Sequence, residues 1–354
     1  MRTIISSDFV ISDRGGVVEN RHAVHAAVVD STGKLLYALG DPSRITLARS
    51  AAKPAQAVAI LEAGTFEKFS FDDADLALMC ASHSSEERHI SRAHGILSKI
   101  GACEEDLKCG GHKPVSEAVH HAWIKAGFTP TPACSNCSGK HAGMIAATKT
   151  LGADVGSYHL PDHPLQLRIR ATVDEICGLA EQESLWGLDG CNLPTPAFPL
   201  KMLGRMYVSF ASAIDSEQKD SSPRIKAQAS VFRAMSQNSE FVAGDDRFCT
   251  ALMQAFDGLV IGKLGADGCY GVGIRKSACT RHIGAEGAVG FAVKIEDGNI
   301  GILYSAVTEI LEQLHIGEAS MRLQLDRFHS PEIKNTVGVV TGKVFPSFKL
   351  HQMQ

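Results

Sequence analysis

The distribution of strand-like and helix-like segments constrains the fold of this chain more than any other feature of its sequence. Short apolar runs typical of strands lie near both ends, and segments typical of helices fill the middle. Strands and helices do not alternate along the chain as they do in a doubly wound parallel sheet. The pattern therefore predicts one mainly antiparallel sheet built from both chain ends, with a helical region inserted between them.

Strands are predicted where short apolar runs are separated by turn residues. Residues 24–29 and 35–39 flank the sequence Asp30-Ser31-Thr32-Gly33-Lys34, and this spacing predicts a β-hairpin with a glycine-bearing turn. The strand-like runs nearer the C-terminus are short and punctuated by glycine. They are 259–263, 269–275, 288–295 and 337–344.

Helices are predicted where apolar residues recur at helical spacing. The first, over residues 50–63, has Pro54 in its first turn and Gly64 just beyond its end, and both are typical positions for these residues. The further expected helices are 86–100, 117–126, 138–150, 164–179, 200–213, 224–238, 247–256 and 302–314.

These elements predict an α/β (α+β) protein in two parts that form one compact unit. Residues 1–48 and 257–354 are expected to form the sheet-bearing part, with helices against the sheet. Residues 49–256 are expected to form a helix-rich insertion that carries most of the site motifs. With 354 residues, the chain is long enough for one large domain or two moderate ones.

Composition excludes several classes of function and indicates a compartment. The formal charge of −4 leaves no basic surplus for binding nucleic acid or an anionic membrane. No window approaches the ~18 apolar residues of a membrane span. Residues 1–10 lack the basic and apolar regions of a secretion signal. Ten cysteines scattered over a long chain without such a signal indicate reduced thiols, so we expect a cytoplasmic protein.

The stretch from Cys134 to Met144, CSNCSGKHAGM, gathers two thiols, a lysine and a histidine around one glycine. It is typical of a loop that enters a helix N-terminus, where unpaired N–H groups and the helix dipole lower the pKa of a nearby thiol. Cys137 and Lys140 are three residues apart, so a helix directs both side chains the same way. The stretch therefore indicates a metal site or a catalytic site.

Three other interpretations of this stretch compete with a site. Cys134 and Cys137 could form a thiol–disulfide pair, although the early βαβ setting of that motif is missing. Ser138-Gly139-Lys140 could end a phosphate-binding loop, but that motif requires glycine at position 134 and serine or threonine at position 141. The thiols could also be core residues, which is the interpretation that we favour for Cys134 alone.

A further cysteine follows an acid in the sequence Asp189-Gly190-Cys191, which predicts a sharp loop. Cys191 could be a third metal ligand, with Asp189 paired to a cation such as Lys140. Two cysteines and one further donor would leave a tetrahedral zinc with an open position for water. Lysine is a rare metal ligand because it must first lose its proton. The alternative interpretation of the segment Asp189-Gly190-Cys191 is a buried turn without a metal.

Two segments supply candidate serines. Ser50-Ala51-Ala52-Lys53 is a Ser-x-x-Lys pair at the start of a predicted helix, where one turn places the amine beside the serine oxygen. A lysine held partly dry near another cation loses its proton near neutral pH and can act as a base. Ser82 follows an apolar run in the second segment, residues 80–89. The alternative there is an ordinary helix N-cap at Ser84 or Ser85.

The sequence GKLGADG at residues 262–268 lies at the end of a predicted strand. A glycine-rich strand end offers free N–H groups to a substrate carboxylate or to an oxyanion. A β-bulge or a hairpin turn is the alternative that we favour for this segment.

Four of these motifs, taken together, resemble the inducible asparaginase family first described from rhizobia, the class 3 asparaginases. They occur in family order and with family-like spacing. The four motifs are residues 49–54, 80–84, 136–144 and 189–191.

The resemblance implies a fold similar to serine β-lactamases, penicillin-binding proteins and bacterial glutaminases. It implies hydrolysis of L-asparagine to L-aspartate and ammonia, and a homodimer. The implied catalytic residues form two Ser–Lys pairs in one site. They are Ser50 with Lys53, and Ser82 with Lys140. Which of the two serines attacks is left open.

The resemblance also implies a metal and a set of substrate-binding residues. One zinc per chain would be held by Cys137, Lys140 and Cys191, with water as the fourth ligand, and would orient the substrate. The implied substrate-binding residues are Arg49, His141 and Asp189. Ser85 departs from the pattern, because glycine is expected at this position in many relatives.

Two other functions stay open. One is a different amidohydrolase on the same fold, such as a glutaminase or a penicillin-type acyl transferase. The other is a zinc- or redox-binding module in which Cys134, Cys137 and Cys191 matter and the serines do not. Ammonia release from L-asparagine, compared with L-glutamine, separates these possibilities.

Overall fold

The computed structural model describes residues 8–180 and 183–353, and these group into two compact units. Unit 1 comprises the described residues of 1–51, 197–215 and 251–354, and unit 2 comprises those of 52–196 and 216–250. Residues 197–215 therefore group with the sheet, although they fall inside the predicted insertion. That the parts form one compact body stays a prediction. The secretion-signal prediction rests largely on residues 1–7, which lie outside the described residues.

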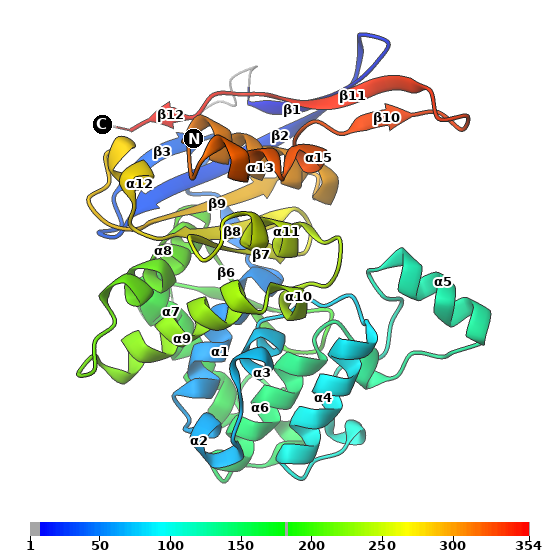
Figure 1. Cartoon of the computed structure of the whole chain (residues 1–354). Helices are drawn as coiled ribbons and strands as arrows, with labels where there is room; N and C mark the ends of the chain where they lie inside the picture. The colour runs from blue at the N-terminus through cyan, green and yellow to red at the C-terminus, as the bar shows by residue number, and fades with distance from the viewer. Residues whose placement is uncertain (1–7, 181–182, 354) are drawn as a thin grey trace. The chain divides into compact units, whose positions relative to one another are not determined.

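Unit 1 is built on an antiparallel sheet to which both chain ends contribute (Figure 1). Its strands are β1 (Phe9–Arg14), β2 (Val17–Asp30), β3 (Leu35–Leu39), β7 (Val260–Gly265), β8 (Cys269–Ile274), β9 (Val289–Ile295), β10 (Glu332–Lys334), β11 (Val340–Ser347) and β12 (His351–Gln352). The strand order is β10-β11-β1-β2-β9-β8-β7, and β3 pairs with β2 and β12. β1 pairs with both β2 and β11. The predicted α/β (α+β) class, with a mainly antiparallel sheet built from both ends, is confirmed.

Helices cover both faces of this sheet. They are α8 (Leu200–Ser216), α11 (Phe248–Ala255), α12 (Ala278–His282), α13 (Ile300–Gln313), α14 (Ala319–Leu323) and α15 (Asp326–His329). On one face, glycines of β8 and β9 leave room for α8, because a Cβ at Gly271 would lie 2.1 Å from the Tyr207 ring. On the other face, Tyr270 of β8 contacts Tyr304 of α13 edge to face.

A short second sheet contains β4 (Ile45–Leu47), β5 (Leu185–Leu188) and β6 (Pro194–Pro199). In unit 1, β4 pairs with residues 197–199 of β6 in antiparallel register. The one-turn 3₁₀ helix Arg49–Ala52 follows β4 directly. The predicted helix over residues 50–63 therefore begins as this 3₁₀ turn and continues as an α-helix.

Unit 2 is helical (Figure 1). Its helices are α1 (Lys53–Leu61), α2 (Thr65–Phe69), α3 (Asp73–Met79), α4 (Glu87–Lys99), α5 (Glu117–Ala126), α6 (Ser138–Thr150), α7 (Pro164–Cys177), α9 (Pro223–Gln237) and α10 (Ser239–Val242). α6 packs against α1, α3, α4 and α7 and is buried on all sides over residues 138–148. A helix that neighbours surround in this way is expected to lack a polar face. No helix in the described part of the chain has the length and apolar character needed to cross a membrane.

Glycines on α6 set how closely this helix approaches α3. A Cβ at Gly139 would lie 2.5 Å from the backbone oxygen of Leu78, and one at Gly143 would lie 2.8 Å from the Met79 sulfur. The backbone oxygen cannot move aside as a flexible side chain can, so Gly139 is the less replaceable of the two. The close approach brings the loop after α3 beside the first turn of α6.

We expect Gly139→Ala to lower the free energy of unfolding by about 1–3 kcal/mol, because the added methyl group overpacks the contact with α3. Chemical denaturation with urea measures this change. The matched control is Gly95→Ala in α4, where a Cβ would meet no atom within 4 Å. Alanine should stabilise that helix by roughly 0.5–1 kcal/mol. Equal effects of the two substitutions would contradict the packing argument.

Candidate active site

A buried lysine connects three segments of unit 2 that carry sequence-predicted site residues. Lys53 is the first residue of α1, and its side-chain nitrogen donates hydrogen bonds to Ser82 Oγ at 3.1 Å and to Cys137 Sγ at 3.2 Å. It also donates to the backbone oxygen of Ala81. A buried charge is tolerated where it is paired and hydrogen-bonded. Here the Lys53 nitrogen has three acceptors around it, which is as many as a lysine side chain can use.

The second lysine, Lys140, lies in the first turn of α6 and reaches the turn that precedes β6. Its side-chain nitrogen donates to Cys191 Sγ at 3.3 Å. Cys137 is the N-cap residue of the same helix, and its thiol also lies beside Cys191. One helical turn thus directs Cys137 and Lys140 toward the same sulfur, as their three-residue spacing predicts.

The two thiols influence each other's titration. The hydrogen bond with Cys191 and the nearby lysine charges hold the pKa of Cys137 well below its ordinary value, although burial opposes this. The hydrogen bond with Cys137, together with burial, raises the pKa of Cys191. Burial alone would lower the pKa of Lys140, but the two thiols and the Asp189 carboxylate raise it overall. These opposite shifts make Cys137 the more acidic of the two thiols and favour the charged form of Lys140.

The polar segment between α3 and α4 is fixed by hydrogen bonds to distant segments. Ser84 Oγ donates to the backbone oxygen of Ala243 at 2.9 Å, and Ser85 Oγ donates to the backbone oxygen of Cys134 at 2.7 Å. The N-cap of α4 is Glu86, which forms a capping box with the third residue of the helix. The interpretation of Ser84 or Ser85 as the cap is therefore wrong, because these hydroxyls serve tertiary contacts instead.

Ser85 has a left-handed backbone, with φ of 59°. This conformation favours glycine, which explains why glycine is expected at this position in relatives. The Ser85 N–H donates to His83 Nδ1 at 3.1 Å, so the proton of this imidazole is on Nε2, which lies 2.9 Å from Ser138 Oγ. Burial keeps the pKa of His83 well below its usual value. A neutral histidine therefore links the serine segment to the first residue of α6.

Arg49 and Ser50 belong to unit 1, where they lie in the 3₁₀ turn beside the edge strand β7. A Cβ at Gly265 would lie 2.5 Å from the backbone oxygen of Ala48, so this glycine permits the close approach. Arg49 pairs with Asp267 at 2.6 Å in the turn between β7 and β8. The segment 262–268 thus forms a hairpin turn, as its alternative interpretation predicts, and this turn lies next to the candidate serine.

His141 directly follows Lys140 in α6, and Cys134 ends the short turn before that helix. His141 is fully buried, and burial together with the charges of Lys140 and Lys53 keeps its pKa well below the usual value. Cys134 is buried and hydrogen-bonds to Thr131, as expected for a core thiol. All ten cysteines are free, so Cys134 and Cys137 do not form a disulfide.

A metal would be held by an unusual donor set. In the described residues, no three His, Cys, Asp or Glu side chains converge as metal ligands. Cys137 and Cys191 are a buried pair of sulfur donors, and Lys140 is the next donor beside them. Sulfur donors suit zinc, and an amine can join them once it has lost its proton. Cys137, Cys191 and Lys140 therefore fit a zinc-like ion, provided that Lys140 is deprotonated.

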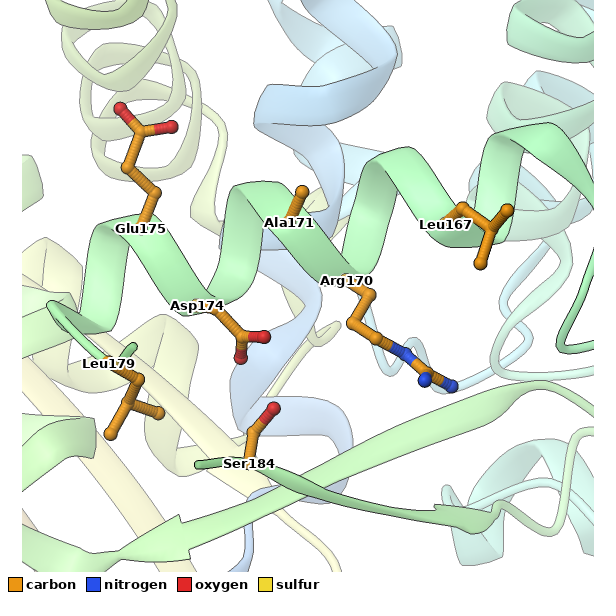
Figure 2. A pocket seen from close by; sticks show the side chains of 7 residues that line it. All are labelled: Leu167, Arg170, Ala171, Asp174, Glu175, Leu179 and Ser184. Atoms are coloured by element: carbon orange, nitrogen blue, oxygen red, sulfur yellow. The ribbon is translucent and has the colours of Figure 1, made fainter. Parts of the chain in front are cut away.

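A cavity of about 640 Å³ lies along α7, and no predicted site residue lines it. Leu167, Arg170 and Asp174 come from α7, while Ser184 comes from the segment that follows the helix (Figure 2). Burial raises the pKa of Asp174. Neither the sequence motifs nor the lysine–thiol cluster involves this cavity.

Two residues near the thiol cluster were missed in the sequence. Cys109 interacts electrostatically with Cys137 and Lys140, and burial raises its pKa to about 11. Tyr158 hydrogen-bonds to His141. Neither residue belongs to a recognisable motif, and both come from irregular segments outside the stretch from Cys134 to Met144. Only the tertiary fold brings them to the site.

Comparison with protein families identifies the chain. The family model described as L-asparaginase II matches residues 10–346, which is nearly the whole length. A search of curated proteins gives no match. The match covers the four motifs from which the asparaginase resemblance was drawn, and it confirms that prediction. The chain belongs to the L-asparaginase II family and is an amidohydrolase that acts on L-asparagine.

Proposed function

We propose that this enzyme hydrolyses L-asparagine through a serine ester, with a zinc-like metal held beside the serines. The observation that carries the proposal is the position of Lys53, whose side-chain nitrogen contacts both Ser82 Oγ and Cys137 Sγ. One buried amine thus joins a candidate serine to a candidate metal ligand. Lysine is a known activator of serine nucleophiles when its environment disfavours the charged form.

Ser50 is the proposed nucleophile. Lys53 takes the Ser50 proton, and Ser50 Oγ attacks the side-chain carbonyl carbon of asparagine. The C–N bond then breaks, and Ser82 with Lys140 relays a proton to the departing ammonia. Water cleaves the ester and releases aspartate. The Ser-x-x-Lys spacing supports the Ser50–Lys53 pair, and backbone N–H groups near Ser50 and Gly265 are candidates to stabilise the oxyanion.

Ser82 is a second candidate nucleophile, and a specific contact favours it. Its oxygen accepts a hydrogen bond from Lys53 at 3.1 Å, so the lysine that would activate Ser50 already contacts Ser82. A lysine shared by two serines would suit a proton relay in which one serine attacks and the other delivers the proton. Single substitutions separate these two roles.

Cys137, Lys140 and Cys191 would hold the metal. A bound cation would favour the neutral amines of Lys140 and Lys53 by its positive charge. The chain's own residues supply the rest. Cys137 already has a depressed pKa and is ready to bind as a thiolate, and Asp189 lies close enough to influence the charge of Lys140. We assign Arg49, His141 and Asp189 to substrate binding on the strength of the family motifs.

We also infer a homodimer in the cytoplasm. The ten free cysteines suit a reducing compartment. The dimer rests on the family resemblance. Analytical ultracentrifugation of the purified protein tests it.

We expect Ser50→Ala to lower the rate of asparagine hydrolysis by several orders of magnitude, because loss of a nucleophile removes the covalent path. Lys53→Met should be about as damaging. Ammonia release at saturating asparagine measures both rates. Denaturation curves show whether the variants stay folded.

Ser31→Ala is the matched control, because Ser31 and Lys34 have the same spacing in an exposed turn. It should keep full activity. If Ser50→Ala kept more than roughly a tenth of the rate while Ser82→Ala lost nearly all of it, Ser82 would be the nucleophile. Mass mapping of an acid-quenched reaction should find the aspartyl ester on the peptide of the attacking serine.

The purified protein should carry up to one zinc-like ion per chain. Cys137→Ser and Cys191→Ser should both lose it, because each removes a sulfur donor. Elemental analysis of the folded variants measures the metal content. Cys134→Ser is the control, since this buried thiol is three residues away and is assigned to the core. Unchanged metal content in Cys137→Ser and Cys191→Ser, or an equal loss of metal in Cys134→Ser, would exclude this ligand set.

Asparagine should be strongly preferred over glutamine. A site that fixes both the nucleophile and the substrate α-carboxylate accepts only one distance between that carboxylate and the reacting carbonyl. Glutamine has one more methylene than asparagine, which moves its side-chain carbonyl by roughly 1 Å. A misplacement of that size can cost about a hundredfold in rate. The ratio of kcat/KM for the two substrates measures the preference. A ratio within about tenfold would instead favour a glutaminase.

A further inference from the structure

Tyr158 and His141 form a buried hydrogen-bonded pair next to the lysine–thiol cluster. The Tyr158 hydroxyl lies 2.6 Å from His141 Nδ1, and neither side chain is exposed to solvent. Their rings also meet edge to face, with centroids 5.7 Å apart. His141 follows Lys140 directly in the first turn of α6, so the pair adjoins a proposed metal ligand and substrate-binding residues.

The hydrogen bonds of the tyrosine determine where the histidine carries its proton. The Tyr158 oxygen accepts the backbone N–H of Lys108 at 3.0 Å. Its own O–H then has His141 Nδ1 as its acceptor, and no further partner of this hydroxyl is found among residues 8–180 and 183–353. A neutral imidazole has one donor and one acceptor nitrogen. If the Tyr158 O–H is to have an acceptor, Nδ1 must be unprotonated, and this assigns the His141 proton to Nε2.

The Nε2–H group is buried and lacks a well-formed hydrogen bond in the described part of the chain. The backbone of Cys191 interacts with the imidazole. A buried donor without a partner costs about 1–3 kcal/mol. Such a cost is tolerated where a ligand supplies the missing acceptor. The donor is therefore in place to serve an oxygen of a bound substrate.

The backbone of Lys108 contacts both Tyr158 and the turn that contains Cys191. The Lys108 N–H binds the Tyr158 hydroxyl, and the Lys108 carbonyl accepts a hydrogen bond from the Asn192 side chain at 3.3 Å. Gln166 donates to the Tyr158 carbonyl at 2.9 Å and fixes the tyrosine backbone. The Tyr158 hydroxyl thus connects His141 to the Lys108 backbone, which is a role that phenylalanine could not fill.

We propose that Tyr158 is a positioning residue whose hydroxyl holds the His141 ring by its Nδ1, so that Nε2–H is directed toward the Cys191 turn, where it donates to an oxygen of bound asparagine. The inference rests on the proposed function, in which His141 binds substrate. It adds a residue to which no motif assigns a role. Tyr158 acts through His141 and does not itself touch the substrate.

A double-mutant cycle with Tyr158→Phe and His141→Ala tests this coupling. We expect Tyr158→Phe to lower kcat/KM for asparagine by about tenfold, which corresponds to loss of roughly one hydrogen bond. The loss should fall mainly on KM, because the donor serves binding. In the His141→Ala background, Tyr158→Phe should have no further effect. Tyr270→Phe, at another buried tyrosine, is the control and should leave kcat/KM unchanged.

The tautomer itself is measured by NMR of the protein with ¹⁵N-labelled histidine. In the wild type, the His141 nitrogens should show the Nε2–H form, and in Tyr158→Phe this preference should weaken. An Nδ1–H form in the wild type, or additive losses in the cycle, would overturn the proposal. If Tyr158→Phe did not fold, the wild-type spectrum would decide alone. Absence of asparagine hydrolysis in the wild type would instead refute the proposed function, whatever the tautomer.

Discussion

The burial of the Lys53 side chain is the constraint on which the candidate site depends. Removing an ammonium group from water costs several kcal/mol unless acceptors surround it. The acceptors are a backbone oxygen at Ala81, the hydroxyl of Ser82 and the sulfur of Cys137. They come from the loop after α3 and from the N-cap of α6. The lysine therefore fixes the relative position of two loops that have no regular structure of their own.

Cys137 belongs both to the contacts of Lys53 and to the proposed metal site. Its sulfur accepts from Lys53, lies beside Cys191, and has a depressed pKa because of both neighbours. Lys140 donates a hydrogen bond to the second sulfur, Cys191 Sγ, at 3.3 Å. Two lysines and two thiols thus form a buried set in which a change of charge on one member alters the others. A cation bound to the thiols would change the electrostatic environment of Ser82, because the Lys53 amine contacts both Cys137 and Ser82.

The sequence predicted helices best where local signals fix both ends. The helix over 117–126 has the predicted limits, since Ser116 caps its start and Gly127 ends it in a left-handed conformation. The strand β1 was missed, although it pairs with β2 across the local turn at Gly15 and Gly16, while its pairing with β11 depends on residues more than 300 positions away. The site motifs supplied the chemically active residues, but not their partners. The contact of Lys53 with Ser82 could not be predicted, because it depends on how α1 packs beside the loop after α3.

Both segments that carry a candidate serine contain a residue with an unfavourable left-handed backbone conformation. Arg49 and Ser85 have positive φ angles of 48° and 59°, which cost about 1–2 kcal/mol for residues with a side chain. Arg49 directly precedes Ser50, and its ion pair with Asp267 holds the strained turn in place. The hydrogen bond of Ser85 to the backbone of Cys134 does the same for the Ser82 loop. Strain compensated by tertiary contacts fixes both serine segments more firmly than local propensity would allow.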